Sequence, residues 1–152
     1  MKTLLEKEGI LRPSDSKSHI IYEFQLERES KRLNIFFSYS PKFLDDREKA
    51  RDLIVKNLSA YMDECPEKAV DSWEEYLPLK NLVTLSFDDP SGFRGAAHRH
   101  PSTQSLFITP ECASPGLLPG TLNIGKWRVV VSAHAVVTEV CSYQLRIWEG
   151  DK

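Results

Sequence analysis

The stretch NLVTLSFDDPSG (residues 81–92) decides the expected fold, because a strongly β-forming run leads directly into a turn sequence. Its first nine residues are rich in apolar and β-branched side chains, a composition typical of strands. The last four residues, Asp89–Gly92, satisfy the preferences of a type I turn. Asp accepts hydrogen bonds at the first position, Pro presets φ at the second, and Gly suits the fourth. We therefore expect a strand over 81–89 that ends in a tight turn.

Runs of alternating apolar and polar residues predict further strands on both sides of this stretch. The predicted strands cover residues 19–27, 32–40, 81–89, 104–109, 126–137 and 141–149. A short charged connection separates the first two, so we expect them to form a hairpin. The last two are expected to form a second hairpin. Residues 110–125 hold three prolines and three glycines, which predicts a long structured loop.

Residues 44–64 change to the helical period, with apolar side chains recurring at every third and fourth position. Asp45 is the expected N-cap, with Glu48 three positions later in a capping-box pattern, and Pro66 is expected to end the helix. Residues 67–81 are compatible with a further helical turn or with a loop. The chain is thus expected to be mainly β, with one amphipathic helix inserted between its second and third strands.

The length of 152 residues fits one domain with a hydrophobic core. Strands joined by Gly/Pro turns are typical of a β-sandwich or barrel, and we expect residues 1–152 to form a single β-sandwich of about seven strands. The net charge of −2 gives no global field that would attract nucleic acid or an anionic membrane. No apolar run approaches the roughly 18–20 residues of a membrane span, and the N-terminus does not have the pattern of a signal peptide.

The three cysteines, Cys65, Cys112 and Cys141, are odd in number and widely spaced. They fit neither a disulfide framework nor a zinc site, so a reducing cytoplasm is the simplest location. At least one of them is expected to be a buried, unreactive thiol. The sequence contains neither a glycine-rich nucleotide-binding motif nor a nucleophile elbow, and no cofactor is expected.

The polar residues His98, Arg99 and His100 follow the turn at a short distance. A His-x-His pair on an extended chain places both imidazoles on one side, as in some zinc sites, but zinc needs further ligands that no spacing rule supplies here. An exposed polar loop and a contact with an anion or another ligand are the alternatives. Arg94 could contact a ligand, pair with Asp88 or bind loop carbonyls.

Three stretches together resemble the β-sandwich module at the N-terminus of CehA/McbA-type PHP-domain metallohydrolases. They are NLVTLSFDDPSGFRGAAHRH (81–100), PECASPGLLPGTLNIGKWRVVVSAHAV (110–136) and CSYQLRI (141–147). The resemblance implies a jelly-roll-like sandwich similar to bacterial pre-peptidase C-terminal (PPC) domains. It also implies that the metal-dependent chemistry belongs to a separate PHP domain. HRHPSTQS (98–105) shares only His-x-His with the motif of that domain, so we expect no catalytic PHP domain in this sequence.

The resemblance and the loop residues together favour a non-catalytic accessory module that binds a small polar or anionic ligand, or a hydrolase partner. The expected contacts are Arg94, His98, Arg99, His100 and His134. One alternative is a small metal-dependent, phosphoesterase-like hydrolase that uses His98, His100 and His134. Another is a structural domain that forms a homodimer, because the edge strands of a sandwich invite pairing.

Overall fold

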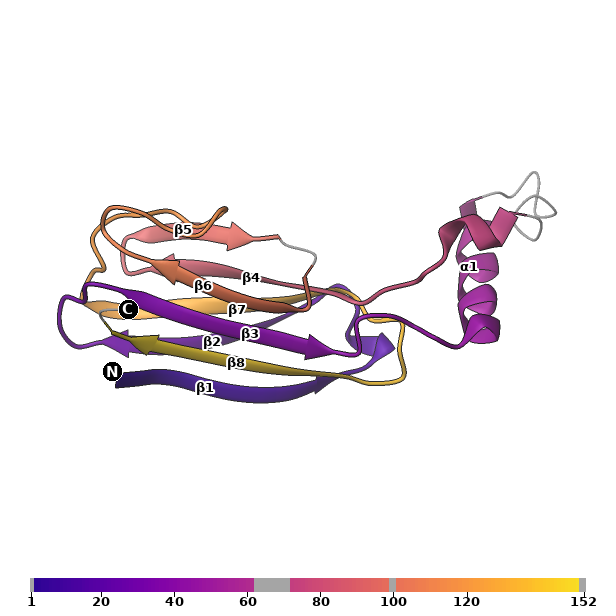
Figure 1. The fold of residues 1–152 in the computed structure, drawn as a ribbon, viewed down its shortest axis with the longest axis horizontal. Helices are drawn as coiled ribbons and strands as arrows, with labels where there is room; N and C mark the ends of the chain where they lie inside the picture. Colours follow the sequence, from indigo (N-terminus) through magenta and orange to yellow (C-terminus); the bar gives the residue numbers. More distant parts are fainter. Residues whose placement is uncertain (1, 62–71, 99–100, 151–152) are drawn as a thin grey trace.

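The computed structural model describes residues 2–61, 72–98 and 101–150, and Figure 1 shows how they are arranged. Within these ranges the chain forms eight strands, one α-helix and two short 3-10 helices. The strands are β1 (Lys2–Leu11), β2 (Ser18–Leu26), β3 (Leu33–Ser40), β4 (Leu82–Asp89), β5 (Gly92–Ala97), β6 (Thr103–Ile108), β7 (Gly125–Ala135) and β8 (Cys141–Glu149). The helices are η1 (Pro13–Asp15), α1 (Arg47–Tyr61) and η2 (Trp73–Tyr76).

The strands lie in two four-stranded antiparallel sheets (Figure 1). Sheet A has the strand order β1-β8-β3-β6, and sheet B has the order β2-β7-β4-β5. The mainly β, sandwich-like fold expected from the sequence is confirmed, and the described residues form eight strands where about seven were expected and six were located.

Both expected hairpins are wrong. β2 pairs with β7 in sheet B, whereas β3 pairs with β6 and β8 in sheet A, so the connection between β2 and β3 crosses from one sheet to the other. β7 lies beside β2 and β4, and β8 lies beside β1 and β3, so their connection crosses as well. Alternation in a sequence identifies which face of a strand is buried, but it does not identify the neighbouring strand.

Two strands, β1 and β5, were not predicted from the sequence. β1 is rich in charged residues and buries Leu5 and Leu11, so its alternation is weak. It is an edge strand of sheet A, and charged side chains protect such an edge from pairing with other chains. β5 is short and glycine-rich, and it forms a hairpin with β4 directly after the predicted turn. The charged sequence of the edge strand β1 therefore weakened its alternation. The short, glycine-rich sequence of β5 read as part of the turn and not as a strand.

The core lies between the sheets and receives buried apolar side chains from all eight described strands. Trp127, Phe37 and Phe87 are among the largest fully buried side chains. Burial of each such side chain stabilises the fold by roughly 1.5–3 kcal/mol. The alternation within residues 32–40 and 141–149 places apolar side chains on one face of each strand, and these side chains are buried in the core: Leu33, Ile35, Phe37 and Tyr39 on β3, and Tyr143, Leu145 and Ile147 on β8.

The cysteines differ in environment. Cys141 is buried in the core, as expected for at least one of the three, and Cys112 is exposed. Cys65 lies outside the described residues.

α1 is the predicted inserted helix, but its start was misplaced by the sequence analysis. Asp46, not Asp45, is the N-cap, because Asp46 Oδ1 accepts hydrogen bonds from the backbone N–H groups of Glu48 and Lys49, both at 3.1 Å. The helix therefore begins at Arg47 rather than at the predicted 44. The predicted last turn, 62–64, and the expected stop at Pro66 lie outside the described residues.

α1 packs against η2, which is the further helical turn that residues 67–81 allowed. Ala50 and Ile54 of α1 are buried, and Arg47 forms an ion pair with Glu74 at 3.1 Å and stacks over the ring of Trp73. Among the described residues, no helix combines the length and apolar character needed to cross a membrane.

One chain segment connects β3 to α1, and another connects η2 to β4. The two segments run side by side as a stalk (Figure 1). The backbone N–H of Leu44 donates to Leu79 O at 2.9 Å, and that of Asn81 donates to Lys42 O at 2.8 Å. These bonds close the base of the insertion, so α1 and η2 project from the sandwich on a paired connection.

Asn81 is fully buried where the stalk meets the sandwich. Its Nδ2 donates to Pro41 O at 2.9 Å and to Thr138 Oγ1 at 2.8 Å. Its Oδ1 accepts the backbone N–H of Val137 at 2.7 Å and that of Thr138 at 3.4 Å. One amide therefore joins both ends of the insertion to the connection between β7 and β8.

Replacing Asn81 by alanine is expected to lower the free energy of unfolding by about 2–4 kcal/mol, because buried groups of Val137, Thr138 and Pro41 lose their partner. Urea unfolding followed by circular dichroism measures this change. Asn57→Ala is the matched control, since Asn57 is exposed on α1 and bonds to Leu53 O within the same helix. The control should change the free energy by less than about 0.5 kcal/mol, and an equal loss in both variants would contradict the role of Asn81.

Candidate functional site

The predicted turn after β4 is present and tight. Asp89 pairs with Gly92 across the β4–β5 hairpin. Asp89 Oδ1 accepts the backbone N–H of Ser91 at 2.7 Å and that of Gly92 at 2.8 Å. This carboxylate oxygen therefore acts as the structural acceptor that the turn sequence predicted.

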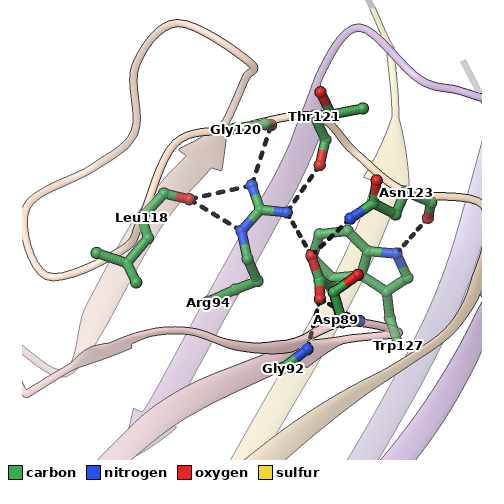
Figure 2. A network of polar contacts seen from close by, with 9 residues as sticks. Asp89, Gly92, Arg94, Leu118, Gly120, Thr121, Asn123 and Trp127 are labelled. Carbon is green, nitrogen blue, oxygen red and sulfur yellow. Dashed lines mark hydrogen bonds and ion pairs between the residues drawn. The ribbon is translucent and has the colours of Figure 1, made fainter.

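Arg94 on β5 lies next to this turn with its guanidinium buried (Figure 2). Nη1 donates to Asp89 Oδ2 at 2.9 Å and to Thr121 O at 2.9 Å. Nη2 donates to Leu118 O at 3.1 Å and to Gly120 O at 3.0 Å. Nε donates to Leu118 O at 3.2 Å. These five bonds match the five N–H donors of a guanidinium, so none is left to bind a ligand.

The same network extends to the core (Figure 2). Asn123 Nδ2 donates to Asp89 Oδ2 at 3.1 Å, and Trp127 Nε1 donates to Asn123 O at 2.9 Å. The guanidinium of Arg94 also lies over the Trp127 ring, 5.1 Å from its centroid. Of the roles that the sequence allowed for Arg94, binding to loop carbonyls is confirmed, and its acidic partner is Asp89 rather than Asp88.

Burial alone would raise the pKa of Asp89, but hydrogen bonds from Arg94, Ser91, Gly92 and Asn123 outweigh it and lower the pKa below 3.8. A carboxyl group whose pKa is lowered by folding stabilises the fold above its unfolded pKa. This contribution is lost as the pH falls through the lower, folded pKa. Asp89 is therefore ionised in the folded protein at neutral pH and belongs to the structure.

Two of the predicted site residues do come together. His98 follows β5 and His134 lies on β7, and their ring centroids are 6.0 Å apart. His134 Nε2 shares a hydrogen bond with Thr84 Oγ1 at 2.7 Å. Arg94 lies apart from them in the buried network, and Arg99 and His100 lie outside the described residues.

A third histidine joins this group from β2. His19 stands opposite Ser132 in the β2–β7 register, and its Nδ1 shares a hydrogen bond with Ser132 Oγ at 2.9 Å. We call His19, His98 and His134 the histidine cluster. His19 was not among the predicted site residues, because only the register between β2 and β7 brings it near His134.

The pKa of His134 is lowered from its ordinary value of 6.5, mainly by partial burial and further by the charges of His98 and His19. The folded state therefore favours the neutral imidazole. The contribution of the neutral His134 ring to the stability of the fold is fully present above about pH 6.5, its ordinary pKa. It is lost as the pH falls toward the lower pKa of His134 in the folded protein. At neutral pH this ring can offer one donor and one acceptor.

A cavity of about 410 Å³ opens beside the histidine cluster, and His134 is one of its lining residues. We call it the helix cavity, because α1 forms one wall and the end of β7 forms the opposite wall. Its apolar walls include Leu53, Ile54, Leu58, Leu79, Val136 and Val137. Asn57, Tyr76 and Ser16 add polar groups.

Metal binding was one of the alternatives for the histidines. Across residues 2–61, 72–98 and 101–150, no three His, Cys, Asp or Glu side chains are grouped so that they could hold a metal ion. A zinc site on His98 and His134 would therefore need a ligand from outside these ranges, such as His100.

Comparisons with known proteins were made on the whole chain. No protein-family model matches it, and no curated protein matches it. Among solved structures, the chain is similar to the crystal structure of GEBA250068378 from Sulfurospirillum deleyianum, with 9% sequence identity and a TM-score of 0.35. The match covers 97% of this chain and 99% of that chain.

Replacing Arg94 by glutamine is expected to lower the free energy of unfolding by about 3–5 kcal/mol, because the buried carboxylate of Asp89 loses its cation. Chemical unfolding at neutral pH measures the loss. Arg128→Gln is the matched control, since Arg128 is half exposed and pairs loosely with Glu23 at 3.7 Å. Its change should stay within about 1 kcal/mol, and a mild effect of Arg94→Gln would show that the network is not a structural requirement.

Replacing His98 by alanine is expected to raise the pKa of His134 toward 6.5, because one of the charges that oppose its protonation is removed. A pH titration of the His134 ring protons by NMR measures this shift. His98→Gln, which keeps a polar side chain but removes the charge, should give the same direction. A pKa of His134 that stays the same or falls in both variants would show that the two rings do not interact.

Proposed function

We propose that this chain is a non-catalytic binding module whose ligand occupies the helix cavity, with His134 providing a hydrogen bond at its rim. The mostly apolar lining of this cavity of about 410 Å³ is the observation that carries the proposal, because small-molecule sites are predominantly apolar and have volumes of roughly 300–1,000 Å³. Such sites combine mostly apolar walls with a few polar groups, and the helix cavity has this composition.

The lining chemistry favours binding over catalysis. None of the described residues that line the cavity is Asp, Glu, Lys, Arg or Cys. Ser16, whose hydroxyl could otherwise act as a nucleophile, is held by the residue that follows β7: its Oγ accepts the backbone N–H of Val136 at 3.0 Å. General acid–base chemistry at this position would depend on His134 and on the hydroxyl of Tyr76, the other titratable side chain in the described lining.

The ligand class follows from the same walls. An apolar body of small-molecule size would bury its surface against Leu53, Leu58 and Val136, and a hydrogen-bonding or anionic group would reach His134. The resemblance to the module that accompanies PHP-domain metallohydrolases supports an accessory role beside such an enzyme.

The probe 8-anilinonaphthalene-1-sulfonate has an aromatic body and one anionic group, and its fluorescence reports binding. Val137→Trp is expected to weaken probe binding by about tenfold or more, because the larger side chain fills the cavity. Leu58→Trp blocks it from the opposite wall and should act in the same way. Val140→Trp is the matched control, since Val140 is exposed in the same β7–β8 connection and is absent from the described lining.

The control variant should bind the probe like the unchanged chain. Probe binding that is equal in Val137→Trp, Leu58→Trp and Val140→Trp, with all three folded by circular dichroism, would place the probe elsewhere and contradict the proposal. Probe release on addition of an unlabelled hydrolase partner would instead identify the cavity as a protein-docking surface.

A further inference from the structure

The outer face of sheet A carries a row of side chains that neither the core nor the helix cavity uses. Asn34 on β3 stands opposite Phe107 on β6 and opposite Trp148 on β8. The alternation of these strands places all three side chains away from the core. Phe107 and Trp148 are half-buried, so each still reaches solvent.

A guanidinium group stacks on each of the two rings. The Cζ atom of Arg32 lies 4.3 Å from the centroid of the Phe107 ring, and that of Arg146 lies 5.0 Å from the centroid of the Trp148 ring. Stacking on an aromatic face holds a guanidinium in place and leaves its edge available for hydrogen bonds. The rings therefore act as supports for two cations on either side of Asn34.

Asn34 connects the two cations and is oriented by one of them. Its side chain is buried, with a residue exposure of 6%, and its Oδ1 accepts a hydrogen bond from Arg32 Nε at 2.8 Å. This bond fixes the amide, so Nδ2 is directed away from Arg32. Asn34 faces Trp148, and Arg146 faces Phe36, two residues further along β3. Asn34 and Arg146 are thus diagonal neighbours on adjacent strands.

Two buried donors on this face have no hydrogen-bond partner within the part of the chain that the structure describes: Asn34 Nδ2 and Arg146 Nε. Nearly all buried donors in folded proteins are satisfied by protein, water or a bound group. Both groups are donors, and both belong to a face with two permanent positive charges. The missing partner is therefore an acceptor, and a negative charge would suit it best.

We propose that Arg32, Asn34 and Arg146 form a binding site for an oxyanion, the phosphate or carboxylate group of a ligand. Guanidinium groups recognise both oxyanions through parallel N–H···O bonds, and the amide of Asn34 adds a third donor between them. Glu6 on β1 stands opposite Arg146 and is exposed, so its carboxylate weakens the positive field at this edge. The site lies on sheet A and is independent of the helix cavity, which lies beside the end of β7.

The test uses the ¹⁵N-labelled chain of 152 residues and two probes, inorganic phosphate and glutarate, titrated separately at low ionic strength. The side-chain resonances of Asn34 Nδ2 and Arg146 Nε are expected to shift with a common saturation curve. Arg146→Lys, which keeps the charge but removes the Nε donor, should weaken binding by about tenfold or more. Asn34→Asp should abolish it, because a carboxylate replaces the donor. Glu6→Gln should strengthen it.

Arg128→Gln is the matched control, because Arg128 belongs to β7 of sheet B and pairs with Glu23. It should leave binding unchanged. Saturation by phosphate alone or by glutarate alone identifies which oxyanion the site prefers and supports the proposal. The proposal is overturned if neither probe shifts the two resonances, or if Arg128→Gln weakens binding as much as Arg146→Lys. Failure of the cavity probe to bind would leave these outcomes unaffected, so the two proposals are tested separately.

Discussion

The buried ion pair between Arg94 and Asp89 holds the long loop 110–124 against the sandwich. β5 and β6 are the edge strands of sheets B and A, and the loop lies along both. Leu118 N donates to Arg94 O at 3.0 Å beside β5, and Ser114 N donates to Phe107 O at 3.0 Å beside β6. Edge strands left open pair readily with other chains, so the loop protects both edges. The guanidinium of Arg94 fixes it by binding three carbonyls from residues 118–121.

Glycine makes this close approach of loop and strand possible. A Cβ on Gly95 would meet Gly116 O, and a Cβ on Gly116 would meet Ala96 O. Both glycines also have positive φ, +106° and +94°, which other residues rarely adopt. The sequences GFRG and SPG, on which the resemblance to a known module rests, are thus the residues that let the loop pack on β5. Backbone geometry therefore accounts for Gly95 and Gly116.

The sequence predicted the features that depend on local pattern. The alternation over 32–40 and 141–149 identified the inner faces correctly, and the turn at 89–92 was predicted from residue preferences alone. Prediction from the sequence failed where the structure depends on which strand or backbone group a residue contacts. The inner face of β3 is compatible with pairing to β2, yet β3 lies in the other sheet. Asp45 and Asp46 are equally good caps by composition, and only the local backbone geometry selects Asp46.

The candidate sites show the same difference between local sequence pattern and contacts that only the fold creates. His98 and His134 are 36 positions apart in the sequence and meet because both β7 and β5 lie beside β4 in one sheet. Arg32, Asn34 and Arg146 gave no motif, since a guanidinium stacked on an aromatic ring has no fixed spacing.

The two proposed regions use different chemistry: the imidazole of His134, which favours the neutral form, on sheet B, and permanently charged guanidiniums on sheet A. Stacked sheets lie about 10 Å apart with the apolar core between them. The described residues of the two regions have no side chain in common and form no hydrogen bond with one another. A ligand at one region would influence the other only by moving the close-packed core, and such cores resist displacement. The sandwich therefore separates its two polar faces energetically as well as in space.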